Sequence, residues 1–170
     1  MVLKIPDGIS VEVKGASLEV KGPNGVLTRA FNSKIVEVKV ANGEVDVVLK
    51  AKQNRKTHAI ANTIEAHLKN MFSGAAKKFE KKMVLVYSHF PVTLEIKGKE
   101  IFIKNFLGEK THRKTKIMGD AKVEVKGQDV IVSGSDIEAV GQTASNIRRA
   151  TKITKRDERV FQDGIYYAIE

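Results

Sequence analysis

The chain contains no cysteine and no tryptophan among its 170 residues. Without cysteine, disulfides, thiol chemistry and cysteine-ligated zinc sites are excluded. Aromatic residues make up only 6% of the chain, so a broad platform for base stacking is a weak candidate mechanism. No apolar run approaches the length of a membrane span, and residues 1–10 lack the apolar core of a signal peptide. We therefore expect a cytoplasmic protein that has no membrane partner.

Recognisable catalytic motifs are also missing from the sequence. There is no nucleophile elbow, phosphate-binding loop or His-Glu-x-x-His segment. The carboxylates are mostly single and alternate with lysines, which is typical of solvated sheet faces. None of the four histidines has a metal-ligand partner at a suitable spacing: His58, His67, His89 and His112. We expect no enzymatic activity, no catalytic residue, no metal and no cofactor.

Acidic residues are in deficit. The chain has 30 Lys and Arg against 20 Asp and Glu, a formal net charge of +10. Such a surplus favours a polyanionic partner, nucleic acid first and an anionic membrane second. Solubility alone is the competing explanation of the charge, but the cations are also clustered. That clustering favours nucleic acid.

What the sequence does contain is an internal repeat. The strings VEVKG at residues 11–15 and LEVK at 18–21 return as LEIKG at 94–98 and IFIK at 101–104. The string VEVK at residues 36–39 returns unchanged at 123–126. A repeat of roughly 85 residues is long enough for a domain with its own core. We expect an N-terminal α+β repeat over residues 1–82 and a C-terminal repeat with a basic tail over 83–170.

Periodicity predicts the same kind of domain twice. Alternating apolar and polar residues predict short strands near residues 9–13, 17–21, 26–31, 35–40, 44–50, 83–87, 92–97, 100–104, 113–117, 121–126 and 129–133. Residues 22–25 have the composition of a tight turn. The fold class is α+β: two tandem duplicated domains, each a mostly antiparallel β-sheet packed with one α-helix.

Each repeat also contains one amphipathic helix. The first is predicted over residues 54–73 and ends at Gly74, with an apolar stripe of Ile60, Ile64, Leu68, Met71 and Phe72. The second is predicted to start at Ser135, which forms a capping box with Glu138. Its stripe consists of Ile137, Val140, Ala144 and Ile147.

The basic residues gather in four places: residues 50–56, 77–82, 110–116 and 148–159. Cations at the end of the second helix also stabilise its dipole, so Arg148, Arg149 and Lys152 have an explanation without a ligand. The 50–56 cluster lies at a helix start, where positive charge is unfavourable, and either an external partner or solvent compensates it. The 110–116 cluster lies in a turn-like segment, which favours contact with a polyanion.

Longer segments carry a family likeness. They are IPDGISVEV at 5–13, YSHFP at 87–91, NFLGEK at 105–110, EAVGQTASNI at 138–147 and FQDGIY at 161–166. With these segments, the chain resembles the archaeal and eukaryotic-type branch of the universal large-subunit ribosomal protein L-six family. The internal duplication is also a feature of that family.

The resemblance implies a structural constituent of the large ribosomal subunit that binds large-subunit rRNA with its second domain. It implies docking near the sarcin–ricin loop and the stalk base, beside neighbouring ribosomal proteins and translational GTPases. Carried onto this chain, the RNA-binding residues are Lys110, His112, Arg113, Lys114, Arg149, Lys152, Lys155, Arg156 and Arg159.

Net charge alone favours the first half of the chain as the RNA-binding half. Residues 1–85 carry 15 basic and 8 acidic side chains, whereas residues 86–170 carry 15 and 12. Clustering and arginine content favour the second half, because arginine suits bidentate phosphate contact. The alternatives are a non-ribosomal RNA-binding or protein-interaction scaffold, and a hydrolase or transferase, for which the sequence supplies no site.

Overall fold

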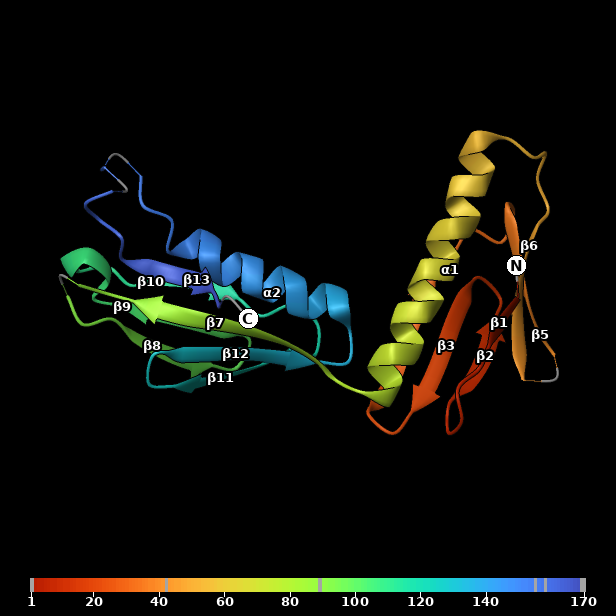
Figure 1. Cartoon of the computed structure of the whole chain (residues 1–170), viewed down its shortest axis with the longest axis horizontal. Coiled ribbons are helices and arrows are strands. Elements are labelled where there is room, and N and C mark those ends of the chain that lie inside the picture. Colours follow the sequence, from red (N-terminus) through yellow and green to blue (C-terminus); the bar gives the residue numbers. More distant parts are fainter. Residues whose placement is uncertain (1, 42, 89, 155, 158, 169–170) are drawn as a thin grey trace. The chain divides into compact units, whose positions relative to one another are not determined.

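A computed structural model describes residues 2–41, 43–88, 90–154, 156–157 and 159–168. The chain forms two compact units, Met1–Lys78 and Phe79–Glu170. Each unit is built from antiparallel strands and one α-helix (Figure 1), so the predicted α+β class is confirmed. We placed the boundary after residue 82. The units divide after Lys78 because the strand that we predicted from residue 83 already begins at Phe79.

The N-terminal unit contains two three-stranded antiparallel sheets. One has the order β1-β6-β5, and the other has the order β2-β3-β4. The strands are β1 (Val2–Lys4), β2 (Ser10–Lys14), β3 (Ser17–Gly22), β4 (Gly25–Ala30), β5 (Val36–Ala41) and β6 (Glu44–Leu49). The sequence did not predict β1, which is three residues long and pairs with β6.

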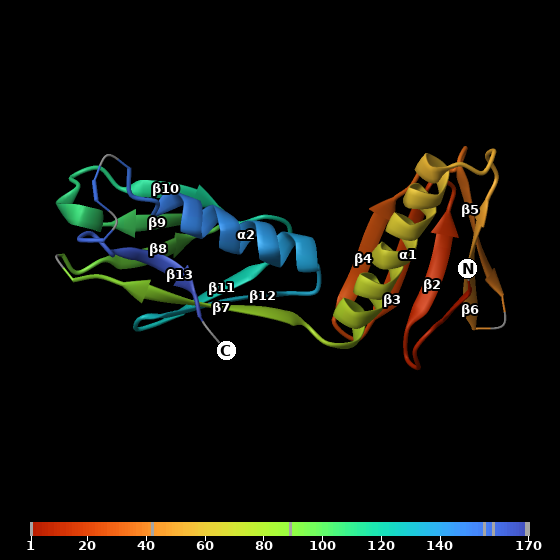
Figure 2. The same cartoon turned by 45° about the horizontal axis from the view of Figure 1, so that its top comes forward.

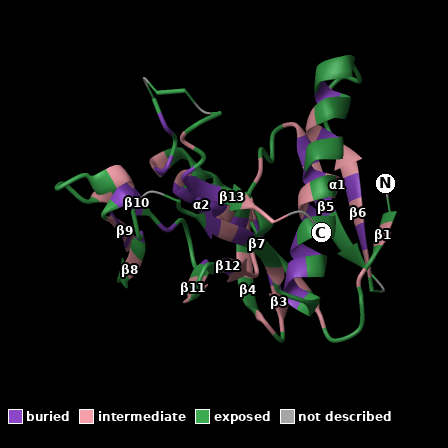
Figure 3. Cartoon of the chain, turned by 60° about the vertical axis from the view of Figure 1, so that its left-hand side comes forward, coloured by how far each residue is buried: buried purple, intermediate pink, exposed green. Residues whose placement is uncertain are grey.

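Helix α1 (Arg55–Ala76) supplies the third part of this core. Asn54 caps it by accepting a hydrogen bond from the Thr57 backbone N–H, while the Thr57 hydroxyl accepts one from the Asn54 N–H. The predicted stripe is buried except for Ile60, which is half-buried. Figure 3 shows that buried and exposed segments alternate along α1, as expected for a helix with one buried face. The predicted stop at Gly74 is wrong. Gly74 is buried within the helix, which continues to Ala76.

The turn at residues 22–25 lies against the end of α1. The Asn24 backbone N–H and its Nδ2 both donate to the Ala75 carbonyl, at 3.3 and 3.2 Å. A Cβ on Gly22 would lie 2.8 Å from the Ala75 Cβ. Glycine is therefore required at position 22 by a close approach between the turn and the helix.

The C-terminal unit has a four-stranded sheet of order β11-β12-β7-β13 and a three-stranded sheet of order β10-β9-β8, all antiparallel. The strands are β7 (Phe79–Val86), β8 (Thr93–Lys97), β9 (Glu100–Lys104), β10 (Arg113–Lys116), β11 (Lys122–Lys126), β12 (Asp129–Gly134) and β13 (Gly164–Tyr167). A short 3₁₀ turn, η1 (Phe106–Gly108), follows β9.

The sequence predicts a basic C-terminal tail and does not decide whether residues 161–167 dock on the second domain. In the structure, β13 pairs with β7 and places Ile165 in the core at 1% exposure. The apolar Ile165 and Tyr167 alternate with Tyr166, a pattern too short for the sequence to distinguish from a loop.

Helix α2 (Ile137–Ala150) covers the core of this unit with Val140, Thr143, Ala144 and Ile147. Its predicted start is wrong. Asp136, not Ser135, is the N-cap, and its carboxylate accepts from the Glu138 N–H at 3.0 Å. Ile137 is 39% exposed because it begins the first turn, before the helix reaches the sheet.

Neither helix has an apolar stretch suited to crossing a membrane within the part of the chain that is described. Over the same residues, no group of three or more His, Asp and Glu side chains is arranged to hold a metal ion.

Candidate nucleic-acid interface

One end of the C-terminal unit brings together two basic segments that are far apart in the sequence. Figures 1 and 2 show η1, the start of β10 and the C-terminal end of α2 at the same end of this unit. The contact is made by Arg113, whose Nη1 donates to the Ala150 carbonyl at 2.9 Å and to the Lys152 carbonyl at 3.2 Å. The 110–116 and 148–159 clusters therefore form one surface.

Arg113 itself is used within the protein. Its Nε and Nη2 donate to the two carboxylate oxygens of Glu109 at 2.8 and 2.6 Å, a bidentate pair. Its guanidinium also lies 4.4 Å from the centre of the Phe106 ring. With four such hydrogen bonds and only 25% of its side chain exposed, Arg113 positions the loop and the helix end rather than presenting a free cation.

Glu109 is a carboxylate that lies between the two basic segments. Its hydrogen bond with Arg113 lowers the pKa of the carboxyl below its usual value, and the charge of Arg156 lowers it further. Arg156 in turn lies 4.7 Å from the centre of the Phe161 ring. Glu109 thus links the 110–116 cluster to the segment after α2 by charge as well as through Arg113.

The loop before β10 has an unusual backbone. Asn105 and Leu107 have positive φ angles of 58° and 52°, which non-glycine residues rarely adopt. The Asn105 Nδ2 donates to the Pro91 carbonyl at 3.0 Å, and Phe106 is 1% exposed. The loop is therefore anchored on both sides, and it presents the residues that follow in a defined position.

The structure places most of the predicted RNA-binding residues on the surface. Those that are exposed are Lys110, His112, Lys114, Arg149, Lys152, Arg156 and Arg159. Arg113 is half-buried, and Lys155 lies outside the described residues.

Lys114 faces away from Arg113, onto the outer surface of β8, β9 and β10. Its Nζ lies 5.2 Å from the centre of the Phe102 ring, and the Lys97 Nζ lies 5.5 Å from the same centre. Sequence reasoning missed Phe102 and Lys97. The alternation in β9, where Ile101 and Ile103 are buried, is the signal that places Phe102 on the outer face.

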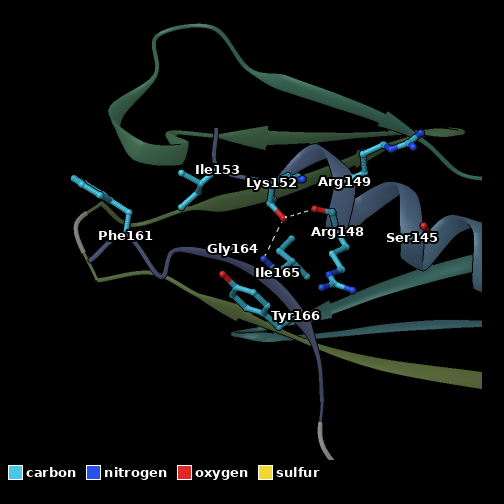
Figure 4. A pocket seen from close by; sticks show the side chains of 10 residues that line it. Ser145, Arg148, Arg149, Lys152, Ile153, Phe161, Gly164, Ile165 and Tyr166 are labelled. Carbon is cyan, nitrogen blue, oxygen red and sulfur yellow. Dashed lines mark hydrogen bonds between the residues drawn. The ribbon is translucent and has the colours of Figure 1, made fainter. Parts of the chain in front are cut away.

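A pocket of about 450 Å³ lies between the end of α2 and β13 (Figure 4). Arg148, Arg149 and Lys152 supply its cations, and Phe161 and Tyr166 supply its aromatic rings. Arg148 extends toward Tyr166, whereas Arg149 points away from it (Figure 4). Sequence reasoning assigned no role to Tyr166, because the pocket forms only when β13 pairs with β7.

The Thr151 hydroxyl holds the two sides of the pocket together. It donates to the Arg148 carbonyl at 3.1 Å and accepts from the Ile165 N–H at 3.1 Å. Gly164 allows the Tyr166 ring to lie across the strand, since a Cβ at position 164 would be 3.1 Å from ring atoms. The lining is therefore fixed in place by the backbone.

Comparison with known proteins agrees with this geometry. A family model described as Ribosomal protein L6 matches residues 5–78 and 90–164, one segment in each unit. The large ribosomal subunit protein uL6 of Ignicoccus hospitalis is 45% identical over 174 residues, which cover 99% of this chain and 94% of that protein. The proteins of the same name from Methanosarcina mazei and Haloarcula marismortui are 45% and 43% identical over 96% of this chain, and the matches cover 93% and 92% of those proteins.

The duplicated α+β fold and these matches over nearly the whole length identify the family. The chain belongs to the Ribosomal protein L6 family and is therefore a structural, non-enzymatic protein of the large ribosomal subunit.

Proposed function

We propose that the C-terminal unit binds large-subunit rRNA through the surface formed by the 110–116 and 148–159 clusters. The observation that carries this proposal is Arg113, because its hydrogen bonds to Ala150 and Lys152 join the two clusters. We place the contact near the sarcin–ricin loop and the stalk base, beside the translational GTPases, as the family resemblance implies.

The charges of this surface suit phosphate groups. Within the described residues, no carboxylate lies within 4.0 Å of the charged nitrogens of Lys110, Lys114, Arg149 or Lys152. By contrast, sheet lysines pair with glutamates in both units, as Lys14 does with Glu19 and Lys104 with Glu95. Unpaired exposed cations release more counterions when they meet a phosphate backbone. This difference supports the surface at the end of α2 and on β10 as the RNA contact, although the net charge of the C-terminal half is lower.

The mechanism is rigid presentation of cations to a folded RNA. The anchored loop and the end of α2 keep the charges in a fixed arrangement, which recognises the shape of the phosphate backbone with little base readout. If about six phosphates are neutralised, the log–log salt dependence of binding has a slope of about −4 to −5. No proton transfer or bond cleavage is required.

The location can be tested because the chain has no cysteine of its own. Single cysteines at the exposed positions Thr111 and Ser145 accept an iron chelate that generates hydroxyl radicals near the C-terminal surface. Asn70, exposed on α1, is the matched position in the N-terminal unit. Each labelled chain is assembled into large subunits, and the rRNA cleavage sites are mapped.

We expect T111C and S145C to cleave the sarcin–ricin loop or the stalk base, and N70C to give a different and weaker pattern. Strong cleavage of this region from N70C, with none from T111C and S145C, would reverse the assignment of the two units. Cleavage from T111C and S145C at a distant rRNA helix would contradict the proposed location.

A further inference from the structure

We propose that the pocket between α2 and β13 receives a single unpaired base of the rRNA, turned out of its helix. This inference rests on the proposed function, because it names a second kind of contact made by the same surface. The phosphate contacts described above need only exposed cations. A concave site with aromatic walls goes beyond that need and suits a planar ring.

The size and lining of the pocket fit a nucleotide. Its volume of about 450 Å³ falls within the range of about 300–1,000 Å³ that is typical of small-ligand sites. Ile153 and Ile165, which are 7% and 1% exposed, form its apolar floor. A base needs such a floor, whereas a phosphate group or a metal ion does not.

The aromatic geometry favours stacking. The Tyr166 ring lies against Gly164 and keeps 42% of its surface exposed. Arg148 extends beside Tyr166 (Figure 4), with its guanidinium 5.4 Å from the centre of the neighbouring Tyr167 ring. Tyrosine rings and arginine planes are the groups on which proteins stack unpaired RNA bases. Arg148 and Tyr166 both line the pocket, so each offers a planar group to one base.

The charge of the lining favours a nucleotide over other planar ligands. Arg148 and Lys152 line the pocket, Arg149 lines its rim with its side chain directed away from Tyr166, and the described residues of the lining include no Asp or Glu. A base that leaves its helix brings its own phosphate and the phosphate of the next nucleotide, which these cations neutralise. A neutral apolar ligand or an apolar protein side chain gains nothing from these cations.

The pocket is built before any ligand arrives. The Thr151 hydroxyl bridges Arg148 and Ile165, and the pairing of β13 with β7 fixes the strand that carries Tyr166. A preformed site avoids the cost of ordering its own side chains on binding. The main cost that remains is unstacking the base, which is small where the base is already unpaired.

The absence of tryptophan allows a direct test in the full chain. Tyr166→Trp keeps a stacking ring in the pocket and introduces a single fluorescent reporter. Tyr87→Trp is the matched control, because Tyr87 is 37% exposed and does not line the pocket. Each variant is titrated with deproteinised large-subunit rRNA, and fluorescence is compared with binding measured by filter retention.

We expect the fluorescence of Y166W to be strongly quenched when the RNA binds, while Y87W binds the RNA without quenching. Tyr166→Ala should weaken binding about ten-fold, within the range for loss of one stacked base, and should leave the salt slope unchanged, because no charge is lost.

Two kinds of result distinguish a failure of the base pocket from a failure of the proposed rRNA binding. Normal RNA binding by Y166W without quenching, or by Y166A without loss of affinity, would overturn the base pocket and leave the rRNA contact standing. Failure of the wild-type chain to bind the RNA would overturn both.

Discussion

At the scale of single residues, neighbours in the sequence have different tasks. Arg113 and Lys114 were both predicted to touch RNA. In β10 their side chains face opposite ways, because strand residues alternate. Arg113 donates to Glu109, Ala150 and Lys152, whereas Lys114 lies exposed over Phe102. A cluster of basic residues therefore contains both a positioning residue and an exposed cation.

Substitution separates the two tasks. Arg113→Ala should lower the free energy of unfolding of the C-terminal unit by about 1.5–3 kcal/mol, as expected for hydrogen bonds that involve a charged group. Lys114→Ala should change that free energy by less than about 0.5 kcal/mol and should weaken RNA binding instead. Urea unfolding measures the first effect and filter retention the second. Equal stability of the two variants would contradict the positioning role of Arg113.

Glu109 gives a pH-dependent signature. Its pKa is lowered in the folded chain, mainly by the hydrogen bond with Arg113. Its carboxylate therefore stabilises the fold above the unfolded value of about 4.5, and this contribution is lost as pH falls through the lower folded pKa. Unfolding followed by circular dichroism from pH 6 to pH 3 should show a smaller loss of stability in Glu109→Gln than in the wild type. A steeper loss of stability in the variant would contradict a stabilising role of the Glu109 carboxylate.

At the scale of elements, the close contact of the 22–25 turn with α1 depends on glycine. A Cβ at Gly22 would lie 2.8 Å from the Ala75 Cβ and 3.0 Å from the Ala75 carbonyl oxygen. Gly22→Ala should therefore destabilise the N-terminal unit by about 1–3 kcal/mol, the usual cost of overpacking. Thermal unfolding of the full chain measures the change. An unaltered unfolding temperature would show that the 22–25 turn can move away from Ala75 without loss of stability.

At Gly141 in α2 we expect the opposite effect of a Gly→Ala substitution, which is a gain in stability. It is exposed, and a Cβ there meets no atom within 4 Å among those described. Gly141→Ala should raise the free energy of unfolding by about 0.5–1 kcal/mol, because alanine loses less backbone entropy in a helix. The same unfolding measurement checks it, and a destabilised variant would contradict this account of the helix surface.

Sequence patterns predicted most elements, and the failures have physical causes. The helices and longer strands were predictable because their buried faces repeat at regular spacings. The strands β1 and β13 were missed because each is three or four residues long and is defined by its pairing partner, β6 or β7. The basic segments of the candidate site were visible as clusters. Their contact through Arg113, and the pocket beside Tyr166, depend on tertiary packing that no local pattern encodes.

At the scale of the whole molecule, total charge is a poor guide to the binding surface. Residues 1–85 carry the larger net charge, but sheet lysines in both units pair with glutamates, as Lys14 does with Glu19 and Lys104 with Glu95. Lys114 on β10 and the cations Arg149 and Lys152 at the end of α2 are exposed without such partners among the described residues. We propose that unpaired clustered cations, rather than the count of basic residues, mark the face for RNA.

The salt dependence of binding to deproteinised large-subunit rRNA tests this claim most directly. The variant K114A/R149A/K152A removes three C-terminal cations, and K52A/R55A/K56A removes three exposed cations around the start of α1 as a matched control. We expect the log–log slope of the first variant to become shallower by about 2–3 units, at roughly 0.7–0.9 for each lost phosphate contact, and the slope of the control to stay at the wild-type value. An unchanged slope in the first variant, with a shallower slope in the control, would show that the other half of the chain binds the RNA.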